Sequence, residues 1–358
     1  MSGFLRILIL TPGALPQISG NAVTAERWRR GLAGLGHEVR VVASEDLAPA
    51  ELSGCARAFR PQLLHAHHAF KSGRLVLAAD LAHLPVVVSP AGTDLSLDLP
   101  DPDRGAVVRQ ALQRAGRIVV QSEDAARQVG EALPGLRERI VAVPKSLATL
   151  GDEPWDLRRA CGVGPEELLF LHPAGVRPVK GNLEVLGELV ELQRRRPRVR
   201  AVFLGPALDP VYAARFEAAV DAAPFAHWLP GVSPNRMPAA YRAADVVLNA
   251  SRAEGLANVL LEAAEAGVPV LASDIPSNRW AVGGEAGGAP GGLLYDPGAP
   301  GGFLRQALRL VDEPPLREAL SRAALERARR LPRPEQEASA LAAVYRSVLG
   351  SGAVARTG

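Results

Sequence analysis

The chain has 358 residues, more than one hydrophobic core usually organises, so two domains of roughly 150 to 180 residues are expected. Hydrophobic residues make up 47% and charged residues 22%, which is typical of a folded enzyme and not of a disordered chain. The net charge is only +3 and aromatic residues are 4%, so no nucleic-acid partner is predicted.

The first half of the chain alternates apolar strands with helices. A strand over residues 5–10 and a loop containing Pro and Gly lead to a helix expected over residues 24–35, which Gly36 ends. Further strands are expected at residues 37–43, 62–68, 85–90, 117–122 and 139–144, with helices near 72–82 and 104–115. Continuous apolar strands between helices indicate a parallel sheet. Residues 1–150 are therefore predicted to form a doubly wound, Rossmann-like α/β domain.

The same rhythm restarts after residues 145–160, whose Gly and Pro content suits a connection between domains. Strands are expected at residues 168–174, 200–206, 227–231, 245–251, 269–274 and 291–296. Residues 151–332 are predicted to be a second Rossmann-like domain, and residues 333–358 a C-terminal helix that packs back on the first. Because ligands bind outside the carboxyl ends of parallel strands, the site is expected in a cleft between the domains.

Cysteine usage and the opening residues bear on location. Cys55 and Cys161 have no spacing that suits a metal site or a redox pair, so both are interpreted as reduced thiols, which favours the cytoplasm. The apolar run within residues 1–16 is too short to span a membrane and fits a strand and turn better than a signal peptide. No transmembrane segment is predicted, peripheral membrane contact stays open, and no oligomeric state is assigned.

Residues 245–278 carry the most specific motif, a buried strand that runs through a loop into a helix. Glu254 is expected in the loop or first helical position, and Glu262 two turns into the helix, where a carboxylate can accept hydrogen bonds from ribose hydroxyls. Gly255 lets the backbone approach a ligand closely. Unpaired amides at a helix N-terminus attract phosphate, and three are expected here, those of Leu256, Ala257 and Asn258. Each glutamate alone could equally be a solvated or capping residue.

Two glutamates separated by seven residues in this frame resemble the retaining nucleotide-sugar glycosyltransferases of family 4, which have the GT-B fold. The resemblance is most specific over residues 245–278 and extends more weakly over nearly the whole chain. It implies two Rossmann-like domains facing across a cleft, a UDP-sugar or similar donor held by the second domain, and a small-molecule acceptor on the first. On the resemblance alone, base contacts are expected near Pro230 to Val232.

Residues 172–182 place Arg177 and Lys180 three positions apart in a turn after a strand. Two cations at a strand end suit a diphosphate, although surface charges on a loop are the simpler alternative. In the resembled family, an Arg and a Lys in this frame neutralise the donor diphosphate without a metal. No metal and no cofactor are therefore expected.

Gly20 and Asn21 open the helix after the first strand, where Gly permits close approach of a phosphate or sugar. The three spaced glycines of a dinucleotide site are missing, so a nicotinamide cofactor is not predicted. Residues 20–28 resemble two narrower groups, the glycosyltransferase 1 domain-containing proteins and the bacterial selenosugar synthases, and residues 207–212 are closer to the former. Transfer of an N-acetylhexosamine to selenophosphate is therefore an alternative function.

His65, His67 and His68 end a predicted strand, and a histidine there could line the cleft or pack in the core. Adjacent strand residues point to opposite faces, so one metal ion could recruit only His65 and His67, and a metal site is the weaker interpretation.

Two short segments follow the next predicted strand. Thr93 and Asp94 resemble the family's acceptor-side loop and are expected to line the cleft, unless Asp94 caps the next element. Asp101 and Asp103 match an Asp-x-Asp metal motif only superficially, because they lie in a Pro-rich loop.

The expected reaction is retaining transfer of a hexose-type sugar to an acceptor that the sequence does not identify. Arg177, Lys180 and helix amides would stabilise the leaving diphosphate, while Glu254 orients the sugar and stabilises the transition state electrostatically. A nucleotide-sugar epimerase and a non-catalytic nucleotide-sugar binder are the weaker alternatives.

Overall fold

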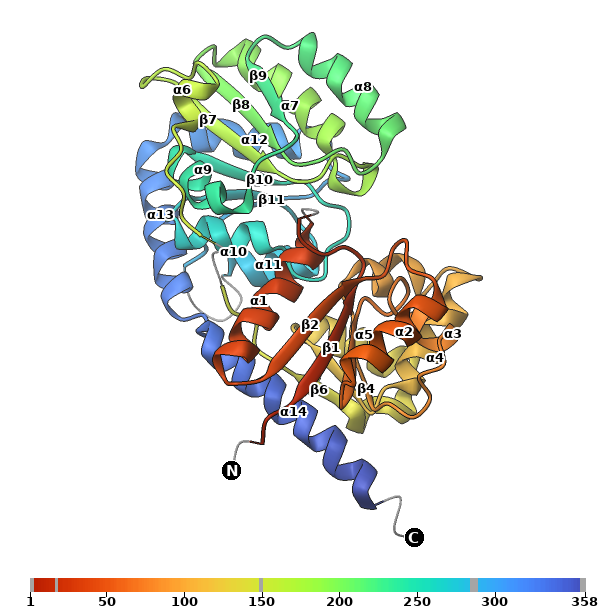
Figure 1. Cartoon of the computed structure of the whole chain (residues 1–358). Coiled ribbons are helices and arrows are strands. Elements are labelled where there is room, and N and C mark those ends of the chain that lie inside the picture. Colours follow the sequence, from red (N-terminus) through yellow and green to blue (C-terminus); the bar gives the residue numbers. More distant parts are fainter. Residues whose placement is uncertain (1–2, 17–18, 148–150, 284–288, 355–358) are drawn as a thin grey trace. The chain divides into compact units, whose positions relative to one another are not determined.

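The structure is a computed structural model that describes residues 3–16, 19–147, 151–283 and 289–354. The chain divides into two compact units (Figure 1). Unit 1 comprises Met1–Ala148 together with Pro332–Gly358, and unit 2 comprises Thr149–Leu331. Among the described residues, no helix is both long and apolar enough to cross a membrane.

Unit 1 is built on a parallel sheet of six strands in the order β2-β1-β3-β4-β5-β6. Its strands are β1 (Arg6–Thr11), β2 (Glu38–Ala43), β3 (Leu63–His67), β4 (Val86–Ser89), β5 (Arg117–Val120) and β6 (Ile140–Ala142). Ile7 of β1 pairs with Val39 of β2 and with Leu63 of β3. The strand order therefore reverses at β1 and β3, which makes their carboxyl ends the usual place for a ligand.

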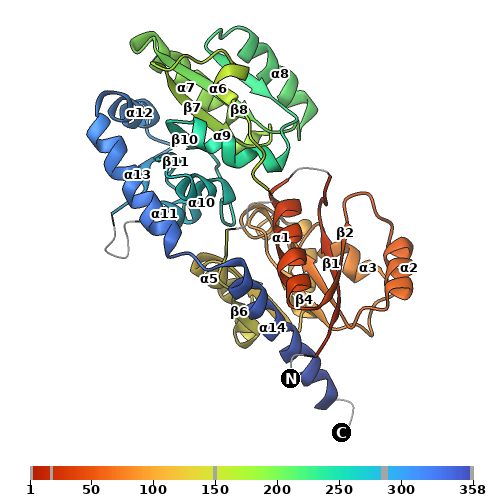
Figure 2. The same cartoon turned by 60° about the vertical axis from the view of Figure 1, so that its left-hand side comes forward.

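Helices cover both faces of this sheet. They are α1 (Gly20–Gly34), α2 (Pro49–Phe59), α3 (Gly73–Ala78), α4 (Arg104–Arg114), α5 (Glu123–Ala132) and α14 (Pro334–Val354), with the π-helical turn η1 (Asp94–Asp98) and the 3-10 turn η2 (Pro134–Arg139). On one face, α1 and α14 lie side by side (Figure 2). There Trp28 of α1 and Tyr345 of α14 form a buried cluster with Ile7 and Ile9. On the other face, buried side chains of α2, α3, α4 and α5 form a second cluster.

The first helix differs from the sequence-based prediction. It was expected to begin at residue 24, but α1 already begins at Gly20 because Ser19 caps it, its hydroxyl accepting a hydrogen bond from the Ala22 amide at 3.1 Å. Helix α2 has no counterpart in the prediction, and the helix expected over residues 72–82 is shorter, spanning Gly73–Ala78.

Glu337 fastens α14 to the rest of unit 1. Its carboxylate, 1% exposed, accepts hydrogen bonds from Arg27 at 2.9 and 3.1 Å and from the Trp28 indole at 2.7 Å. Gln121 adds a further bond at 2.7 Å and the Ser146 amide another at 3.1 Å. A buried carboxylate is costly unless it is paired and hydrogen-bonded, and Glu337 meets both conditions.

Unit 2 has a second parallel six-stranded sheet, in the order β12-β11-β10-β7-β8-β9. Its strands are β7 (Leu168–Pro173), β8 (Val199–Leu204), β9 (Ala226–Leu229), β10 (Val246–Asn249), β11 (Val270–Ser273) and β12 (Gly292–Tyr295). Val247 of β10 pairs with Leu171 of β7 and with Val270 of β11. Because successive strands run outward from both β7 and β10, the strand order of this sheet reverses between these two neighbours.

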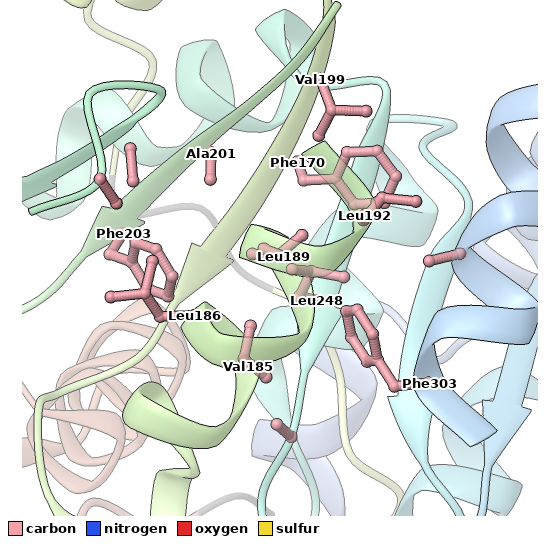
Figure 3. Close-up of a cluster of buried hydrophobic side chains, with 14 of the residues drawn as sticks. Phe170, Val185, Leu186, Leu189, Leu192, Val199, Ala201, Phe203, Leu248 and Phe303 are labelled. Atoms are coloured by element: carbon pink, nitrogen blue, oxygen red, sulfur yellow. The ribbon is translucent and has the colours of Figure 1, made fainter. Parts of the chain in front are cut away.

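The helices of unit 2 are α6 (Leu157–Ala160), α7 (Asn182–Arg195), α8 (Pro210–Asp221), α9 (Met237–Ala243), α10 (Asn258–Glu265), α11 (Pro276–Val282), α12 (Gly302–Asp312) and α13 (Pro314–Arg329), with the 3-10 turns η3 (Pro178–Lys180) and η4 (Pro234–Arg236). Phe170 of β7, Phe203 of β8 and Leu248 of β10 meet Leu189 of α7 and Phe303 of α12 in a buried cluster (Figure 3). This core fixes the strands, and so the loops that follow their carboxyl ends.

Candidate functional site

The turns after β7 and β10 bring Lys180 and Glu254 together. Lys180 ends η3, the turn after β7, and Glu254 lies in the loop after β10. The Lys180 Nζ donates a hydrogen bond to Glu254 Oε1, and the two side chains are only 17% and 15% exposed. The carboxyl ends of two neighbouring strands at the reversal of strand order thus carry a half-buried ion pair, where open α/β sheets bind their ligands.

Glu254 is held as a carboxylate. Burial alone would raise its pKa, but the Lys180 charge and hydrogen bond, the Ser251 hydroxyl and the Arg177 charge outweigh burial and lower the pKa below its ordinary value. The side chain is therefore negative at neutral pH and can stabilise positive charge that develops nearby.

Arg177 supplies a cation whose hydrogen-bonding capacity is not used up within unit 2. Its Nε is buried, and among the described residues no acceptor lies within hydrogen-bonding distance of it. The Arg177 amide donates to the Asn182 side chain at 3.3 Å, which holds the backbone of the turn. A buried guanidinium N–H without an acceptor is costly, and an anionic ligand would relieve that cost.

His172 lies next to this pair at the end of β7 and is only 1% exposed. Burial and the Lys180 charge lower the pKa of His172 to about 3, so its ring is neutral. Its Nδ1 has no hydrogen-bond partner among the described residues. This residue was not predicted from the sequence, because a histidine within an apolar strand resembles an ordinary core residue.

The helix after Glu254 begins later than predicted. Helix α10 starts at Asn258, with Ala257 as its cap residue and no side-chain cap. Leu256 and Ala257 therefore precede the helix, and of the three predicted amides only that of Asn258 belongs to its first turn. Glu262 is consequently the fifth helical residue, about one turn into α10 instead of two.

Glu262 is oriented by a tyrosine that the sequence analysis did not single out. The Tyr241 hydroxyl on α9 donates to Glu262 Oε2 at 2.6 Å. Burial and the charge of Glu262 raise the pKa of Tyr241 well above its ordinary value, so the phenol stays protonated and keeps donating. Gly255 lies in the same loop as Glu254, and Val232 lies half-buried in the loop after β9, the edge strand of this sheet.

In unit 1, three of the four residues expected on the acceptor side are buried, and the fourth, Thr93, is half-buried. Of the two places expected for His65, the structure shows the core of unit 1. His65 is 0% exposed, stacks on Trp28 and contacts the hydroxyls of Tyr345 at 2.7 Å and Ser89 at 2.6 Å. Burial lowers its pKa to about 3, so it is a neutral core residue.

His67 is also buried, at 5% exposed, and its pKa is lowered to about 3, chiefly by burial. Its Nδ1 has no hydrogen-bond partner among the described residues. His68 adopts a left-handed backbone with φ of 81°, and its ring contacts the Thr93 hydroxyl at 3.3 Å. Positive φ is uncommon for a residue with a side chain, and it turns the chain sharply at the end of β3.

For Asp94 the structure shows a role in holding the backbone of unit 1, which is closer to the capping alternative. Asp94 is 0% exposed, and its carboxylate accepts hydrogen bonds from the amides of Ala69, Ala91, Gly92 and Leu95. It organises the loop after β4, whereas Thr93 stays half-buried beside His68.

Gly20, Asn21 and the Asp101-Pro102-Asp103 segment were also considered as site residues. A Cβ at Gly20 would meet no atom within 4 Å, so the protein's own packing does not require glycine there, and Asn21 follows in the first turn of α1. Asp101 accepts hydrogen bonds from the amides of Asp103 and Arg104 at 3.0 and 2.9 Å, which caps a turn. Within the described ranges, no group of three acidic, histidine or cysteine side chains could hold a metal ion.

Two family models match the chain. The model described as glycosyl transferases group 1 matches residues 155–327, and the model described as a glycosyl transferase 4-like domain matches residues 46–145. The first falls within unit 2 and the second within unit 1.

Relatives and solved structures agree with these matches. The chain is 24% identical over 325 residues to glycosyltransferase 1 domain-containing protein 1 of Xenopus tropicalis, covering 88% of this chain and 90% of that protein. It is 27% identical over 314 residues to a D-inositol 3-phosphate glycosyltransferase of Segniliparus rotundus, covering 83% and 69% of the two chains. A structure of Anabaena HepE in complex with UDP and glucose superposes with a TM-score of 0.78 at 18% identity, covering 96% and 100%.

Proposed function

Because the chain is a glycosyltransferase of the family 4-like group with the GT-B fold, we propose that it transfers a hexose-type sugar from a UDP-sugar to a small-molecule acceptor. The transfer retains the anomeric configuration and needs no metal ion. The observation that carries the proposal is the cluster of Lys180, Arg177 and Glu254 at the reversal of strand order in unit 2.

Each group in this cluster has a task in the proposed reaction. The bond between the anomeric carbon and the diphosphate oxygen breaks, and the negative charge passes to UDP, which Arg177 and Lys180 stabilise. The acceptor hydroxyl oxygen forms the new bond on the same face of the sugar, and its proton passes to the departing diphosphate oxygen. The carboxylate of Glu254 orients the hexose and stabilises the positive charge that develops on its ring. The amides at the start of α10 and Gly255 add donors for the diphosphate.

The nucleotide has its own contacts in the proposal. Glu262, oriented by Tyr241, accepts hydrogen bonds from the ribose hydroxyls, and the loop containing Val232 contacts the base. The structure of HepE with bound UDP supports the choice of a uridine nucleotide. Gly20 and Asn21 are proposed to contact the donor, while His67 and Thr93 are proposed to contact the transferred sugar or the acceptor. The two unpaired cysteines support a cytoplasmic location.

A transfer assay tests the reaction. Purified protein is incubated with UDP-glucose, UDP-N-acetylglucosamine or GDP-mannose and a panel of acceptors that includes inositol phosphates and selenophosphate, with and without EDTA. We expect sugar transfer from a UDP-sugar at the same rate in EDTA, with the donor's anomeric configuration in the product by NMR. A product with the inverted anomeric configuration would contradict the proposed retention. Full loss of activity in EDTA would contradict the proposal that the transfer needs no metal ion.

Replacing Arg177 by Ala is expected to weaken UDP binding about 10- to 100-fold, because a hydrogen bond to a charged group contributes about 1.5–3 kcal/mol. Calorimetric titration with UDP measures the effect. Arg196→Ala is the matched control, because Arg196 lies at the end of α7, before β8, and forms an exposed ion pair with Asp312. Equal affinities of the Arg177 variant and the wild type would remove Arg177 from the diphosphate site.

Replacing Tyr241 by Phe is expected to weaken UDP binding about three- to tenfold, because Glu262 loses the single hydrogen bond from the phenol that orients it. Tyr212→Phe serves as the control, since Tyr212 donates to Glu184 on α7 at 3.2 Å. If UDP binds both variants as it binds the wild type, Glu262 is not oriented through Tyr241 or does not contact the nucleotide.

A further inference from the structure

The Glu254 carboxylate accepts a hydrogen bond from a serine three residues earlier in the same loop. The Ser251 hydroxyl donates to Glu254 Oε1 at 2.7 Å, and the Ser251 amide donates to the Asn249 side chain at 3.0 Å. Ser251 is 2% exposed and Asn249 is 4% exposed. The loop that carries the carboxylate is therefore held by buried polar groups.

The brace continues into the neighbouring strand and helix. The Ser273 hydroxyl, at the end of β11, donates to the Ser251 carbonyl at 2.6 Å. The Asn278 amide group on α11 donates at 3.0 Å to both the hydroxyl and the backbone carbonyl of Ser273, and at 3.3 Å to the side-chain oxygen Oδ1 of Asn249. Ser273 and Asn278 are both 0% exposed.

Such a network costs more to build than an apolar cluster of the same size. Each buried polar group must be desolvated, and its hydrogen bonds recover that cost. In this network Asn278 Oδ1 has no hydrogen-bond partner among the described residues, whereas its Nδ2 donates to the network. In return the network fixes one arrangement of the loop, because each donor and acceptor has a defined direction. The four residues come from β10 and the loop that follows it (Asn249 and Ser251), from β11 (Ser273) and from α11 (Asn278).

The two oxygens of Glu254 are not equivalent. Lys180 and Ser251 both donate to Oε1, and among the described residues no hydrogen bond reaches Oε2. A bound diphosphate would compete with Glu254 Oε1 for the charge of Lys180. The Ser251 hydroxyl is neutral, so it keeps its hydrogen bond to Glu254 when the nucleotide-sugar binds. Ser251 is thus the contact that can hold Glu254 in place through the reaction.

We infer that Ser251, braced by Asn278 through Ser273, is a positioning residue that directs Oε2 of Glu254 toward the hexose of the donor. The inference rests on the proposed function of the same site. It adds a serine and an asparagine that touch neither the nucleotide nor the sugar but determine how the catalytic carboxylate meets the sugar.

The experiment compares Ser251→Ala with Ser277→Ala and Ser251→Thr. The Ser277 hydroxyl is buried in α11 and has no hydrogen-bond partner among the described residues, so its removal tests the loss of a buried hydroxyl alone. Thr keeps the hydroxyl at position 251 and is the rescue variant. The readouts are the Kd of UDP, the Kd of UDP-glucose and the kcat for release of glucose from UDP-glucose to water or acceptor.

For Ser251→Ala we expect kcat to fall about 10-fold or more, the equivalent of one hydrogen bond to a charged group, while the Kd of UDP stays unchanged. Ser251→Thr should recover much of the rate, and Ser277→Ala should match the wild type. Asn278→Ala should lower kcat in the same direction, since it removes the brace without touching Glu254.

A pH profile separates positioning from simple destabilisation. Lys180, Arg177 and His172 also face Glu254, and they are unchanged in this variant. Because the Ser251 hydrogen bond helps to lower the pKa of Glu254, the acid limb of the kcat profile should move to higher pH in Ser251→Ala.

The outcomes are distinct. If wild-type protein binds no UDP and no UDP-sugar, the proposed function fails and this inference fails with it. If the wild type turns over UDP-glucose and Ser251→Ala keeps the wild-type kcat and acid limb, only the inference is overturned. A parallel loss of UDP binding, kcat and thermal stability in Ser251→Ala would also overturn it, because the serine would then be a general structural residue.

Discussion

Replacing Glu254 by Gln is expected to lower kcat by about 100-fold or more, the size of effect seen when one preorganised charge-stabilising group is removed from an active site. The amide keeps the shape of the side chain and can still accept from Ser251, but it no longer carries the negative charge that offsets charge on the sugar ring. UDP binding should be retained or strengthened, because Lys180 loses its partner in unit 2 and becomes fully available to the diphosphate. Steady-state kinetics and calorimetry with UDP measure the two effects.

Glu265→Gln is the control for this variant. Glu265 is the last residue of α10 and is exposed. The Glu265→Gln variant therefore removes one negative charge from the same segment without removing a contact to Lys180. Wild-type kcat in Glu254→Gln would show that the carboxylate is not the group that meets the sugar, even if Arg177 and Lys180 bind the diphosphate.

Replacing Glu337 by Ala is expected to lower the free energy of unfolding of unit 1 by about 3–5 kcal/mol, the usual cost of leaving a buried charge without its partner. The variant strands the Arg27 guanidinium, which is 4% exposed, and removes the acceptor of the Trp28 indole and the Ser146 amide. Urea denaturation followed by tryptophan fluorescence measures the loss. Since the chain has two units, the transition of unit 1 is to be resolved from that of unit 2.

Glu337 also makes the stability of unit 1 depend on pH in a direction that can be predicted. Burial would raise the pKa of Glu337, but the charge and hydrogen bond of Arg27, with the donors of Ser146 and Trp28, lower it below its unfolded value. A carboxylate with a lowered folded pKa stabilises the protein above its unfolded pKa and loses that contribution as pH falls through the folded pKa. The stability difference between wild type and Glu337→Ala should therefore narrow in acid. Glu335→Ala, on an exposed position of the same helix, should change neither stability nor its pH dependence.

The fold followed from the sequence because periodic apolar patterns dominate it. Twelve runs of mostly apolar residues correspond to β1 to β12, and their alternation with helices is enough to indicate two parallel sheets. Local boundaries were less predictable. Helix α1 begins four residues early because the side chain of Ser19 caps it, and a cap depends on a single hydrogen bond that leaves no periodic trace.

The candidate site was predictable where a residue type and its spacing carry the chemistry. Lys180 and Glu254 are 74 positions apart in the sequence, and the structure joins them because β7 and β10 are neighbours. The roles of the two histidines within β3 were not predictable. His65 and His67 stand two residues apart on one face of a strand, and their burial depends on Trp28 from α1 and, for His65, also on Tyr345 from α14.

The supporting residues were missed for a related reason. Tyr241, Ser251 and Asn278 are common residue types whose contacts arise only when separate elements meet at one edge of the sheet. Ser251 lies inside the recognised motif, and the one clue in the sequence is its place three residues before Glu254, within reach of a side chain on a turn.

The central claim is that unit 2 binds a nucleotide-sugar through its Arg177, Lys180 and Glu262 groups. Thermal stabilisation of the purified protein by UDP, UDP-glucose, UDP-N-acetylglucosamine, GDP-mannose and ADP-glucose, each without added metal, tests it most directly, because a ligand that binds only the folded state raises the apparent stability. The account predicts a rise in Tm with uridine nucleotides that is lost in Arg177→Ala and in Glu262→Ala and kept in Arg196→Ala. No rise with any of the five nucleotides, or a rise that survives in all three variants, would contradict it.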